Sequence, residues 1–184
     1  GLAEHGSGLY AATTRTLFSS PFAAEILANY HATQARIGFE TGENIYGGAG
    51  RDVIFGQGGA HTIYGGGSRD LIDGGDGKDD LRGEDGNDEL RGGLESDTLF
   101  GGEGVDHLYG DEGADDVRGE SGADFVGGGS GNDTLYGGTE GDQLHGESGK
   151  DTLIGEQGAD RFFLDPTSYV ASGPILVDEI RDYN

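Results

Sequence analysis

The sequence has no cysteine, methionine or tryptophan, only three prolines, and eleven lysines and arginines among its 184 residues. Without cysteine the chain lacks the disulfide bonds that secreted domains with little core commonly use. The shortage of basic residues leaves a net charge of −24, which would repel a polyphosphate or an anionic membrane, so we expect no nucleic-acid partner. No apolar run has the length of a transmembrane segment. Because the chain begins at Gly1 and not at methionine, we expect a fragment or a processed product.

Glycine, in contrast, is abundant: forty residues, most of them placed with a period of nine. From Gly47 to Phe163, thirteen nonapeptides follow one another without insertion or deletion, with the consensus G-G-x-G-x-D-x-U-x, where U is apolar. The first position is glycine in all thirteen units, the sixth is aspartate in twelve, and the eighth is Ile, Leu, Val or Phe in all. A disordered Gly/Asp-rich linker would not place an apolar residue at every ninth position, so the pattern predicts a folded repeat.

Each position of the repeat has a physical reason. The leading glycines permit positive φ, so the chain can reverse tightly while backbone carbonyls converge on one point, where the sixth residue adds a carboxylate. The last three residues, x-U-x, form a short strand with the apolar side chain pointing inward. Two consecutive nonapeptides would then close one coil, with turns at alternating edges and strands stacking in parallel. The sequence therefore predicts an all-β solenoid.

These repeats resemble those of the RTX (repeats-in-toxin) family, secreted bacterial proteins whose nonapeptides fold as a calcium-loaded, right-handed parallel β-roll. The resemblance covers about two thirds of the chain. It implies a place outside the bacterial cell or on its surface, and export through a one-step (type I) secretion channel that reads a signal beyond the repeats.

The composition of the array also favours a bound cation. It holds 27 acidic and 8 basic residues, a net charge of −19, and its thirteen apolar side chains are a small core for 117 residues, so we expect the metal-free roll to be unfolded. Ligands of carboxylate and carbonyl oxygen favour calcium over zinc, and several ligands per loop favour it over magnesium.

The expected carboxylate ligands recur in every second nonapeptide and so form two columns. One edge carries Asp52, Asp70, Asp88, Asp106, Asp124, Asp142 and Asp160; the other carries His61, Asp79, Asp97, Asp115, Asp133 and Asp151. If each ion lies between neighbouring turns of one edge, the first edge has six such gaps and the second has five. The gap at His61 lacks a carboxylate, so we expect about ten calcium ions, with a total charge of about +20. The glycines expected to contribute at these turns are Gly47, Gly50, Gly74, Gly77, Gly83, Gly86, Gly101, Gly104, Gly110, Gly113, Gly119, Gly122, Gly128, Gly131, Gly146 and Gly149.

The flanks are expected to close the two ends of the roll. Residues 1–46 read as a cap, with a helix over about 21–36 that starts at Pro21 and a decayed repeat over 38–46 that carries Ile45 at the apolar position. The helix has a second interpretation as the remnant of an upstream domain. Residues 164–184 read as a truncated C-terminal cap, in which Ile175, Val177 and Ile180 would cover the last coils.

A few positions depart from the consensus. The fourth glycine is replaced by Ser68, Glu95 and Glu140, where we expect altered turns and weaker sites. His61 is read as a structural histidine, the alternative being a transition-metal ligand. The ninth position carries outward-facing aromatic residues, read as lateral packing groups or as a surface for sugars: Phe55, Tyr64, Phe100, Tyr109, Tyr136 and Phe163.

The sequence contains no enzyme motif. The H-E-x-x-H of zinc proteases and the G-x-S-x-G of lipases are both absent, and the adjacent Asp115 and Asp116 occur as part of the repeat. Any catalytic domain would therefore lie outside this chain. Two functions remain: a module that folds on binding calcium outside the cell, as part of a larger secreted protein, or an adhesive module that binds polysaccharide or other copies of itself.

Overall fold

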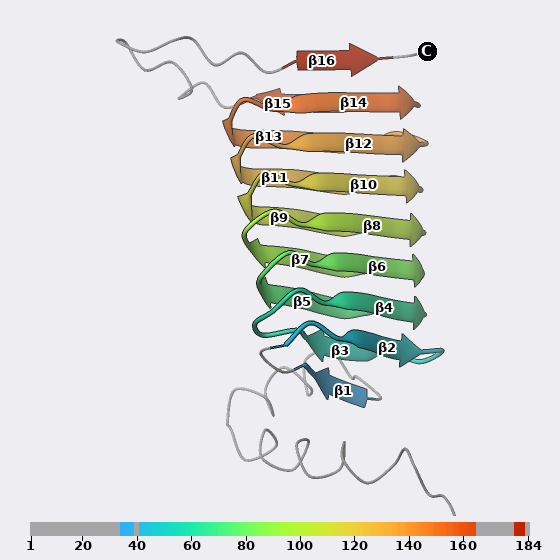
Figure 1. Ribbon diagram of the computed structural model, residues 1–184. Helices are drawn as coiled ribbons and strands as arrows, with labels where there is room; N and C mark the ends of the chain where they lie inside the picture. The colour runs from blue at the N-terminus through green and yellow to red at the C-terminus, as the bar shows by residue number, and fades with distance from the viewer. Residues whose placement is uncertain (1–33, 39–40, 165–178, 183–184) are drawn as a thin grey trace, which may run out of the picture.

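The computed structural model describes residues 34–38, 41–164 and 179–182, and all regular structure in these ranges is β-strand (Figure 1). Two eight-stranded sheets face each other. The first contains β1 (Gln34–Ile37), β3 (Asp52–Phe55), β5 (Leu71–Asp76), β7 (Glu89–Leu94), β9 (His107–Gly113), β11 (Phe125–Gly131), β13 (Gln143–Gly149) and β15 (Arg161–Leu164). The second contains β2 (Asn44–Gly48), β4 (Thr62–Gly67), β6 (Asp80–Asp85), β8 (Thr98–Glu103), β10 (Asp116–Ser121), β12 (Thr134–Thr139), β14 (Thr152–Gln157) and β16 (Glu179–Asp182).

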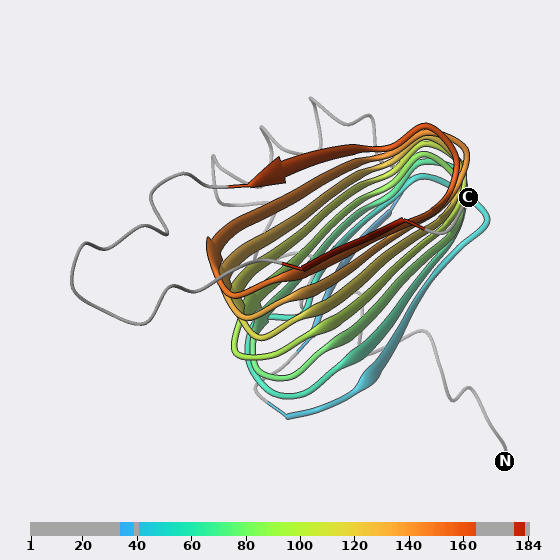
Figure 2. The same ribbon diagram turned by 90° about the horizontal axis from the view of Figure 1, so that it is seen from above.

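The register of the sheets is set by the repeat. Within the array each strand pairs in parallel with the strand one coil further on, so that partners lie two nonapeptides apart in the sequence, as in Leu81↔Leu99 and Leu90↔Leu108. Seen along the stacking axis, the coils superimpose on one flattened outline with a turn at each end (Figure 2). The predicted all-β parallel solenoid is therefore confirmed, while its right-handed sense stays a prediction.

The core is a double column of the apolar side chains at the eighth position. Each coil contributes two of them, one from each sheet, and those in the middle of the array are fully buried. The column consists of Ile45, Ile54, Ile63, Ile72, Leu81, Leu90, Leu99, Leu108, Val117, Val126, Leu135, Leu144 and Leu153, with Phe162 packed against its end. These two columns of side chains fill the space between the sheets, which is why the eighth position is always apolar.

The strands are longer than the x-U-x segments expected from the sequence, because the glycines that follow continue the ladder. β8, for example, runs from Thr98 through Gly101 and Gly102 to Glu103. The second position has positive φ in all thirteen units; seven are glycine, and the others are Gln57, Glu84, Asp111, Glu120, Glu147 and Glu156. A side chain in this left-handed region costs about 1–2 kcal/mol, so six units carry local strain that the stacked neighbours must offset.

The N-terminal flank differs from the expectation in one respect. Most of the predicted helix at 21–36 lies outside the described residues, but its last part, residues 34–36, belongs to β1, so the helix prediction is wrong there. The reason is register: Gln34 pairs with Asp52 and Arg36 with Ile54, one coil away. Ile45 of the decayed repeat lies on the core column and pairs with Ile63.

At the other end, residues after the array add one more strand. β16 pairs with β14, which places Ile180 opposite Leu153. Ile175 and Val177 lie outside the described residues. The boundaries 1–46, 47–163 and 164–184 stay a prediction, because strands from both flanks stack directly on the array.

Candidate functional site

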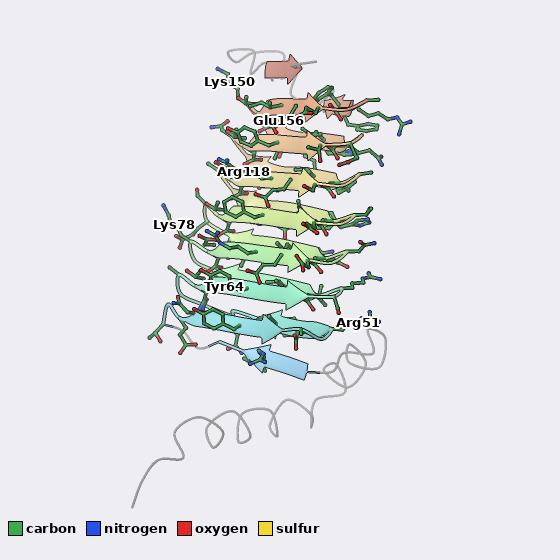
Figure 3. The ribbon with its side chains drawn as sticks, turned by 90° about the vertical axis from the view of Figure 1, so that its right-hand side faces the viewer. Arg51, Tyr64, Lys78, Arg118, Lys150 and Glu156 are labelled. Atoms are coloured by element: carbon green, nitrogen blue, oxygen red, sulfur yellow. The ribbon has the colours of Figure 1, made fainter. Side chains whose placement is uncertain are left out.

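The aspartates of the sixth position lie in two columns, one along each edge of the roll. Eleven of the twelve are at most 3% exposed, and Asp160, at the end of the array, is partly exposed. Figure 3 shows the two edges from the side: Lys78 and Lys150, each next to a column aspartate, project from one edge and Arg51 projects from the other. The aspartates of alternate nonapeptides therefore lie on the same edge of the roll, as the sequence predicts.

Every column aspartate except Asp52 makes the same hydrogen bond through one carboxylate oxygen. Oδ1 accepts the backbone N–H of the sixth residue in the preceding coil, as from Asp88 to Asp106 at 2.7 Å and from Asp106 to Asp124 at 2.8 Å. The backbone carbonyl of Asp106 accepts from Phe125 N–H at 2.9 Å, so it is already used by the ladder. The side chain thus leans toward the coil before it.

The second carboxylate oxygen accepts no hydrogen bond. Oδ2 is buried without a hydrogen bond in all twelve column aspartates: Asp52, Asp70, Asp79, Asp88, Asp97, Asp106, Asp115, Asp124, Asp133, Asp142, Asp151 and Asp160. In Asp52, the first of them, Oδ1 is buried without a partner as well. A buried carboxylate oxygen without a donor is strongly destabilising, because it has lost its hydration and gained nothing in exchange. Two columns of such oxygens form an arrangement that a bound cation would stabilise.

The pKa values of these carboxyls show the same imbalance. The pKa of Asp106 is raised from 3.8 to about 7, chiefly by burial and in smaller part by the charge of the neighbouring Asp88. Burial likewise raises the pKa of Asp97 to about 8, with added repulsion from Asp79 and Asp115. The hydrogen bond from the preceding coil lowers each value but does not compensate for burial. At neutral pH the metal-free columns therefore resist full ionisation.

The glycine of the first position is required by close approach and not by its φ angle. A Cβ on Gly101 would lie 2.5 Å from Oδ2 of Asp106 and 2.7 Å from the carbonyl oxygen of Gly119. At the fourth position Gly104 has a φ of 132°, and a Cβ there would collide with the carbonyl of Gly86. Gly101 thus lies where a backbone oxygen and the orphan carboxylate oxygen crowd together, and Gly104 lies against a backbone carbonyl of the preceding coil.

The ligand set suits a hard cation with many oxygen ligands. Among the described residues, no three His, Cys, Asp or Glu side chains gather round one point. A metal between two turns would therefore be held by an aspartate Oδ2 together with backbone carbonyls of the glycine turns. This set fits Ca²⁺, which accepts six to eight oxygens in flexible geometry, better than Zn²⁺ or Mg²⁺.

The three units without a fourth glycine keep the turn. Ser68, Glu95 and Glu140 adopt φ values of 75–76°, inside the left-handed region. Their aspartates, Asp70 and Asp97 among them, are buried like the others. The expected alteration is therefore a strained backbone in an otherwise unchanged turn; whether these sites bind more weakly stays a prediction.

The outer face of the second sheet carries a ladder of side chains at the ninth position. Aromatic rings alternate there with arginines in the middle of the array: Tyr46, Tyr64, Arg82, Phe100, Arg118 and Tyr136. The guanidinium of Arg118 lies over two rings, 4.5 Å from the centre of Tyr136 and 5.7 Å from that of Phe100, and it binds Asp116 at 2.7 Å. The rings turn their faces to the neighbouring coils, which supports the lateral packing role, while the alternative of a surface for sugars stays a prediction.

The first sheet has a second ring cluster on its outer face. His145 stacks on Phe163 at 4.1 Å between ring centres and lies 4.6 Å from Phe125, which in turn lies 5.4 Å from Tyr109. Burial lowers the pKa of His145, against the opposing effect of Glu147. These residues also join one coil to the next, so both outer faces reinforce the stack.

Adjacent carboxylates at Asp115 and Asp116 do not form a catalytic pair. Asp115 is 3% exposed in an edge turn, whereas Asp116 stands on the outer face of the second sheet with both oxygens on Arg118, at 2.7 and 2.9 Å. Because the two residues are consecutive in the chain, their side chains point to opposite sides.

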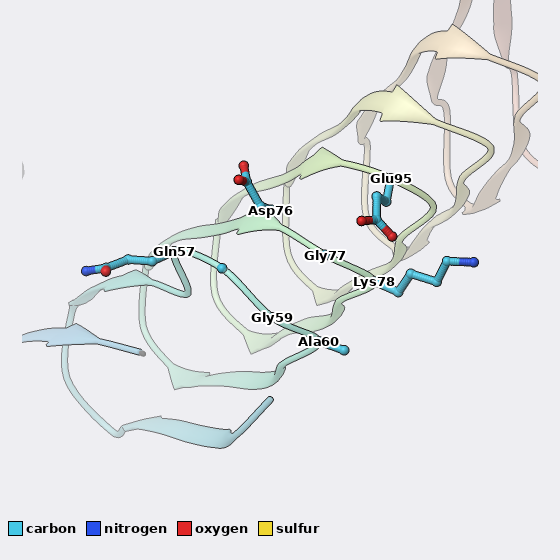
Figure 4. A pocket seen from close by; sticks show the side chains of 8 residues that line it. Gln57, Gly59, Ala60, Asp76, Gly77, Lys78 and Glu95 are labelled. Atoms are coloured by element: carbon cyan, nitrogen blue, oxygen red, sulfur yellow. The ribbon is translucent and has the colours of Figure 1, made fainter. Parts of the chain in front are cut away.

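One hollow lies on the edge that carries His61. It has a volume of about 800 Å³ and is lined by Gln57, Gly58, Gly59, Ala60, Asp76, Gly77, Lys78 and Glu95. The side chains of Gln57 and Lys78 extend away from the turns in opposite directions (Figure 4). Its walls are mainly backbone of three successive turns, so it is a feature of the stack and has no convergent side chains for a substrate.

Comparison with protein families agrees with this geometry. The RTX calcium-binding nonapeptide repeat matches in four copies, over residues 37–72, 62–90, 91–126 and 127–162. No individual curated protein shows significant similarity to the chain. None of the described residues belongs to a helix able to cross a bilayer. The matches span more than half of the sequence, and the roll with its carboxylate columns is a structural, calcium-binding fold: the chain belongs to the RTX calcium-binding nonapeptide repeat family.

Proposed function

We propose that this chain is a folding module of a larger secreted bacterial protein, unfolded where calcium is scarce and folded outside the cell. It would take up about ten calcium ions along its two edges and so support both passage through a type I channel and stability afterwards. Any catalytic activity would belong to another part of that protein. The extracellular calcium concentration lies in the range to which sites of this kind are tuned.

The observation that supports this proposal is the pair of orphan-oxygen columns. Each Oδ2, as in Asp88, Asp106 and Asp124, is buried without a donor, and burial raises the pKa of all three carboxyls to about 7. A folded roll without metal therefore carries a row of unfavourable groups that the unfolded chain would leave hydrated.

In such a module the contacts between consecutive coils are made by the chain's own residues. The first glycines let consecutive turns approach, the Oδ1 hydrogen bonds fix the carboxylates on the preceding coil, and the apolar column aligns the strands. Bound calcium would supply the positive charge that the Oδ2 atoms lack. Because these bonds join each coil to the one before it, we expect folding to spread cooperatively from coil to coil.

Circular dichroism during a calcium titration tests the proposal. In excess chelator the strand signal should be weak, and it should rise steeply over a narrow calcium range. Magnesium at equal concentration should have little effect, because it requires near-octahedral geometry and loses its water reluctantly. A full strand signal in chelator at neutral pH would show that the chain is not a calcium-operated folding module.

The adhesive alternative has no specific support on the described surface. The rings of the second sheet's ladder face neighbouring coils, and Arg82 and Arg118 are paired with Asp80 and Asp116. We therefore favour the folding module over binding to polysaccharide or to other copies of the chain.

A further inference from the structure

His61 stands where every other unit of the array has aspartate, and its surroundings differ from theirs. It is 2% exposed, at the sixth position of the unit that begins at Gly56. The preceding turn on the same edge belongs to the decayed repeat and has Glu43 at the equivalent position. Among the residues that the structure describes, this is the first junction between turns on that edge.

In a consensus junction the carboxylate is only half satisfied. Asp97, on the same edge, accepts the N–H of Asp79 at 2.8 Å through Oδ1, while its Oδ2 is buried without a partner. That oxygen touches the first glycine of its own turn, since a Cβ on Gly92 would collide with it. The junction therefore holds one carboxylate oxygen with no donor.

The imidazole of His61 is satisfied at both nitrogens. Nδ1 accepts the backbone N–H of Glu43 at 3.2 Å, which is the bond that Oδ1 makes elsewhere. Since Nδ1 accepts, Nε2 carries the proton in the neutral ring and donates to the carbonyl of Gly58 at 3.1 Å. No orphan atom remains, and the junction has no negative charge from this side chain.

The ring also fills the space between the two turns. A Cβ on Gly56, the first glycine of its own turn, would lie 3.0 Å from the ring Cδ2, and one on Gly38, the first glycine of the preceding turn, would lie 3.1 Å from Cε1. The imidazole carbons thus fill the space between the two turns, whereas the Oδ2 of a carboxylate such as Asp97 lies against the first glycine of its own turn. Its Nε2–H occupies a carbonyl oxygen of the kind that a cation would need.

The opposite edge has a related contact at the same end of the roll. Arg36 of β1 occupies the position that is apolar in the array, and its Nη2 donates to the carbonyl of Gly47. Burial raises the pKa of Asp52 in this turn, and the Arg36 charge opposes that rise. Side-chain N–H groups of Arg36 and His61 therefore donate hydrogen bonds to turn carbonyls, one on each edge at this end of the roll.

We propose that His61 closes the junction between its own turn and the turn that carries Glu43 without calcium, its neutral imidazole taking the place of carboxylate and ion together. This inference rests on the proposed calcium binding at the other junctions. The junction without a calcium site is then the one between the turns of Glu43 and His61, and not the one between the turns of His61 and Asp79. Asp79 accepts the His61 N–H through Oδ1 and has an orphan Oδ2 of its own, so the second junction keeps its carboxylate. On this edge the N-terminal turn is then joined to the roll by protein hydrogen bonds alone, and its strand offers the calcium-dependent coils an edge on which to stack.

The test is a count of bound calcium by native mass spectrometry in saturating calcium, on the full chain. His61→Asp should bind one ion more than the wild type, and His61→Ala the same number. The matched control is Asp97→His, on the same edge inside the array, which should bind at least one ion fewer. An unchanged count in His61→Asp, or a lower count in His61→Ala, would overturn the inference. A wild type that binds no calcium would instead contradict the proposed function.

A second measurement reads the ring directly. In the calcium-loaded wild type at pH 7.5, nitrogen-15 NMR should show His61 as the neutral ring protonated at Nε2, and addition of one equivalent of zinc should leave its shifts unchanged. A ring protonated at Nδ1, or one whose shifts move on zinc addition, would refute the assignment. Zinc-dependent shifts would indicate the transition-metal ligand.

Discussion

Asp106→Asn should act with opposite sign on the metal-free and calcium-loaded roll. Asp106 lies in the middle of its column with no exposed surface, bonded through Oδ1 to Asp88 N–H and with Oδ2 orphaned. Asparagine has the same shape and keeps an oxygen for the Asp88 bond, but it has no charge and replaces Oδ2 by an amide nitrogen. The substitution therefore removes the buried charge and a calcium ligand together.

The size of the metal-free effect follows from the pKa. Burial raises the pKa of Asp106 from 3.8 to about 7, so its contribution to stability is full below pH 3.8 and lost as the pH rises through 7. One pKa unit corresponds to about 1.4 kcal/mol, and solvent screening at the edge of the roll reduces the effect. Removal of this charge should therefore stabilise the metal-free roll at pH 8 by roughly 2–4 kcal/mol. In calcium the loss of a ligand should raise the folding midpoint about tenfold, equivalent to about 1.4 kcal/mol.

Two titrations followed by circular dichroism measure these effects: calcium at pH 7.5, and pH on the calcium-stripped chain. Asp116→Asn is the matched control, since it removes the same charge from an aspartate 38% exposed in its side chain and paired with Arg118. We expect Asp106→Asn to raise the calcium midpoint and to retain strand signal to higher pH without metal. If both variants shift the calcium midpoint equally, the role given to the orphan oxygens is wrong.

Three further outcomes are expected. The calcium-stripped wild type should gain strand signal as the pH falls from 8 toward 4, because the raised pKa values of the column aspartates favour the protonated form in the folded roll; a flat profile in circular dichroism would contradict this. Gly101→Ala should prevent folding at any calcium concentration, since its Cβ would lie 2.5 Å from Oδ2 of Asp106, whereas Gly67→Ala, with no atom nearer than 3.7 Å, should fold near the wild-type midpoint. Leu108→Ala should lower the free energy of unfolding in saturating calcium by about 2–5 kcal/mol in urea denaturation, since the side chain is fully buried and its neighbours are fixed by the ladder; a loss below about 1 kcal/mol would show that the column can close over the cavity.

The fold could be predicted from the sequence because its information is local and repeated. The apolar residue at the eighth position, as in Leu90 and Leu108, has to point inward, and a period of nine with two units per coil leaves one register, which the structure has. The grouping of the aspartates by edge follows from the same arithmetic. Tertiary context had little chance to override these patterns, since each coil contacts chiefly its neighbours.

Other features depend on interactions that a linear pattern does not express. The lean of each carboxylate toward the preceding coil is set by one backbone N–H, and the ring of His61 is placed by partners in two different turns. Glu120 and its equivalents at the second position adopt a left-handed φ that their residue type disfavours. β1 was missed because Arg36 occupies an apolar position; its spacing of two nonapeptides from Ile54 was the available signal.

The pairing of strands two nonapeptides apart has a consequence for how such a chain changes length. A segment of two nonapeptides can be removed or duplicated while every strand still meets a partner in the same sheet, whereas a single nonapeptide would send all later strands to the opposite sheet. The ladder of rings and arginines is stricter, because Arg82 and Arg118 recur only after four nonapeptides. Deletion of residues 92–127 would bring Arg82 next to Tyr136 and preserve the alternation. Duplication of gene segments in steps of two coils would therefore lengthen the roll and keep the alternation of rings and arginines on the second sheet.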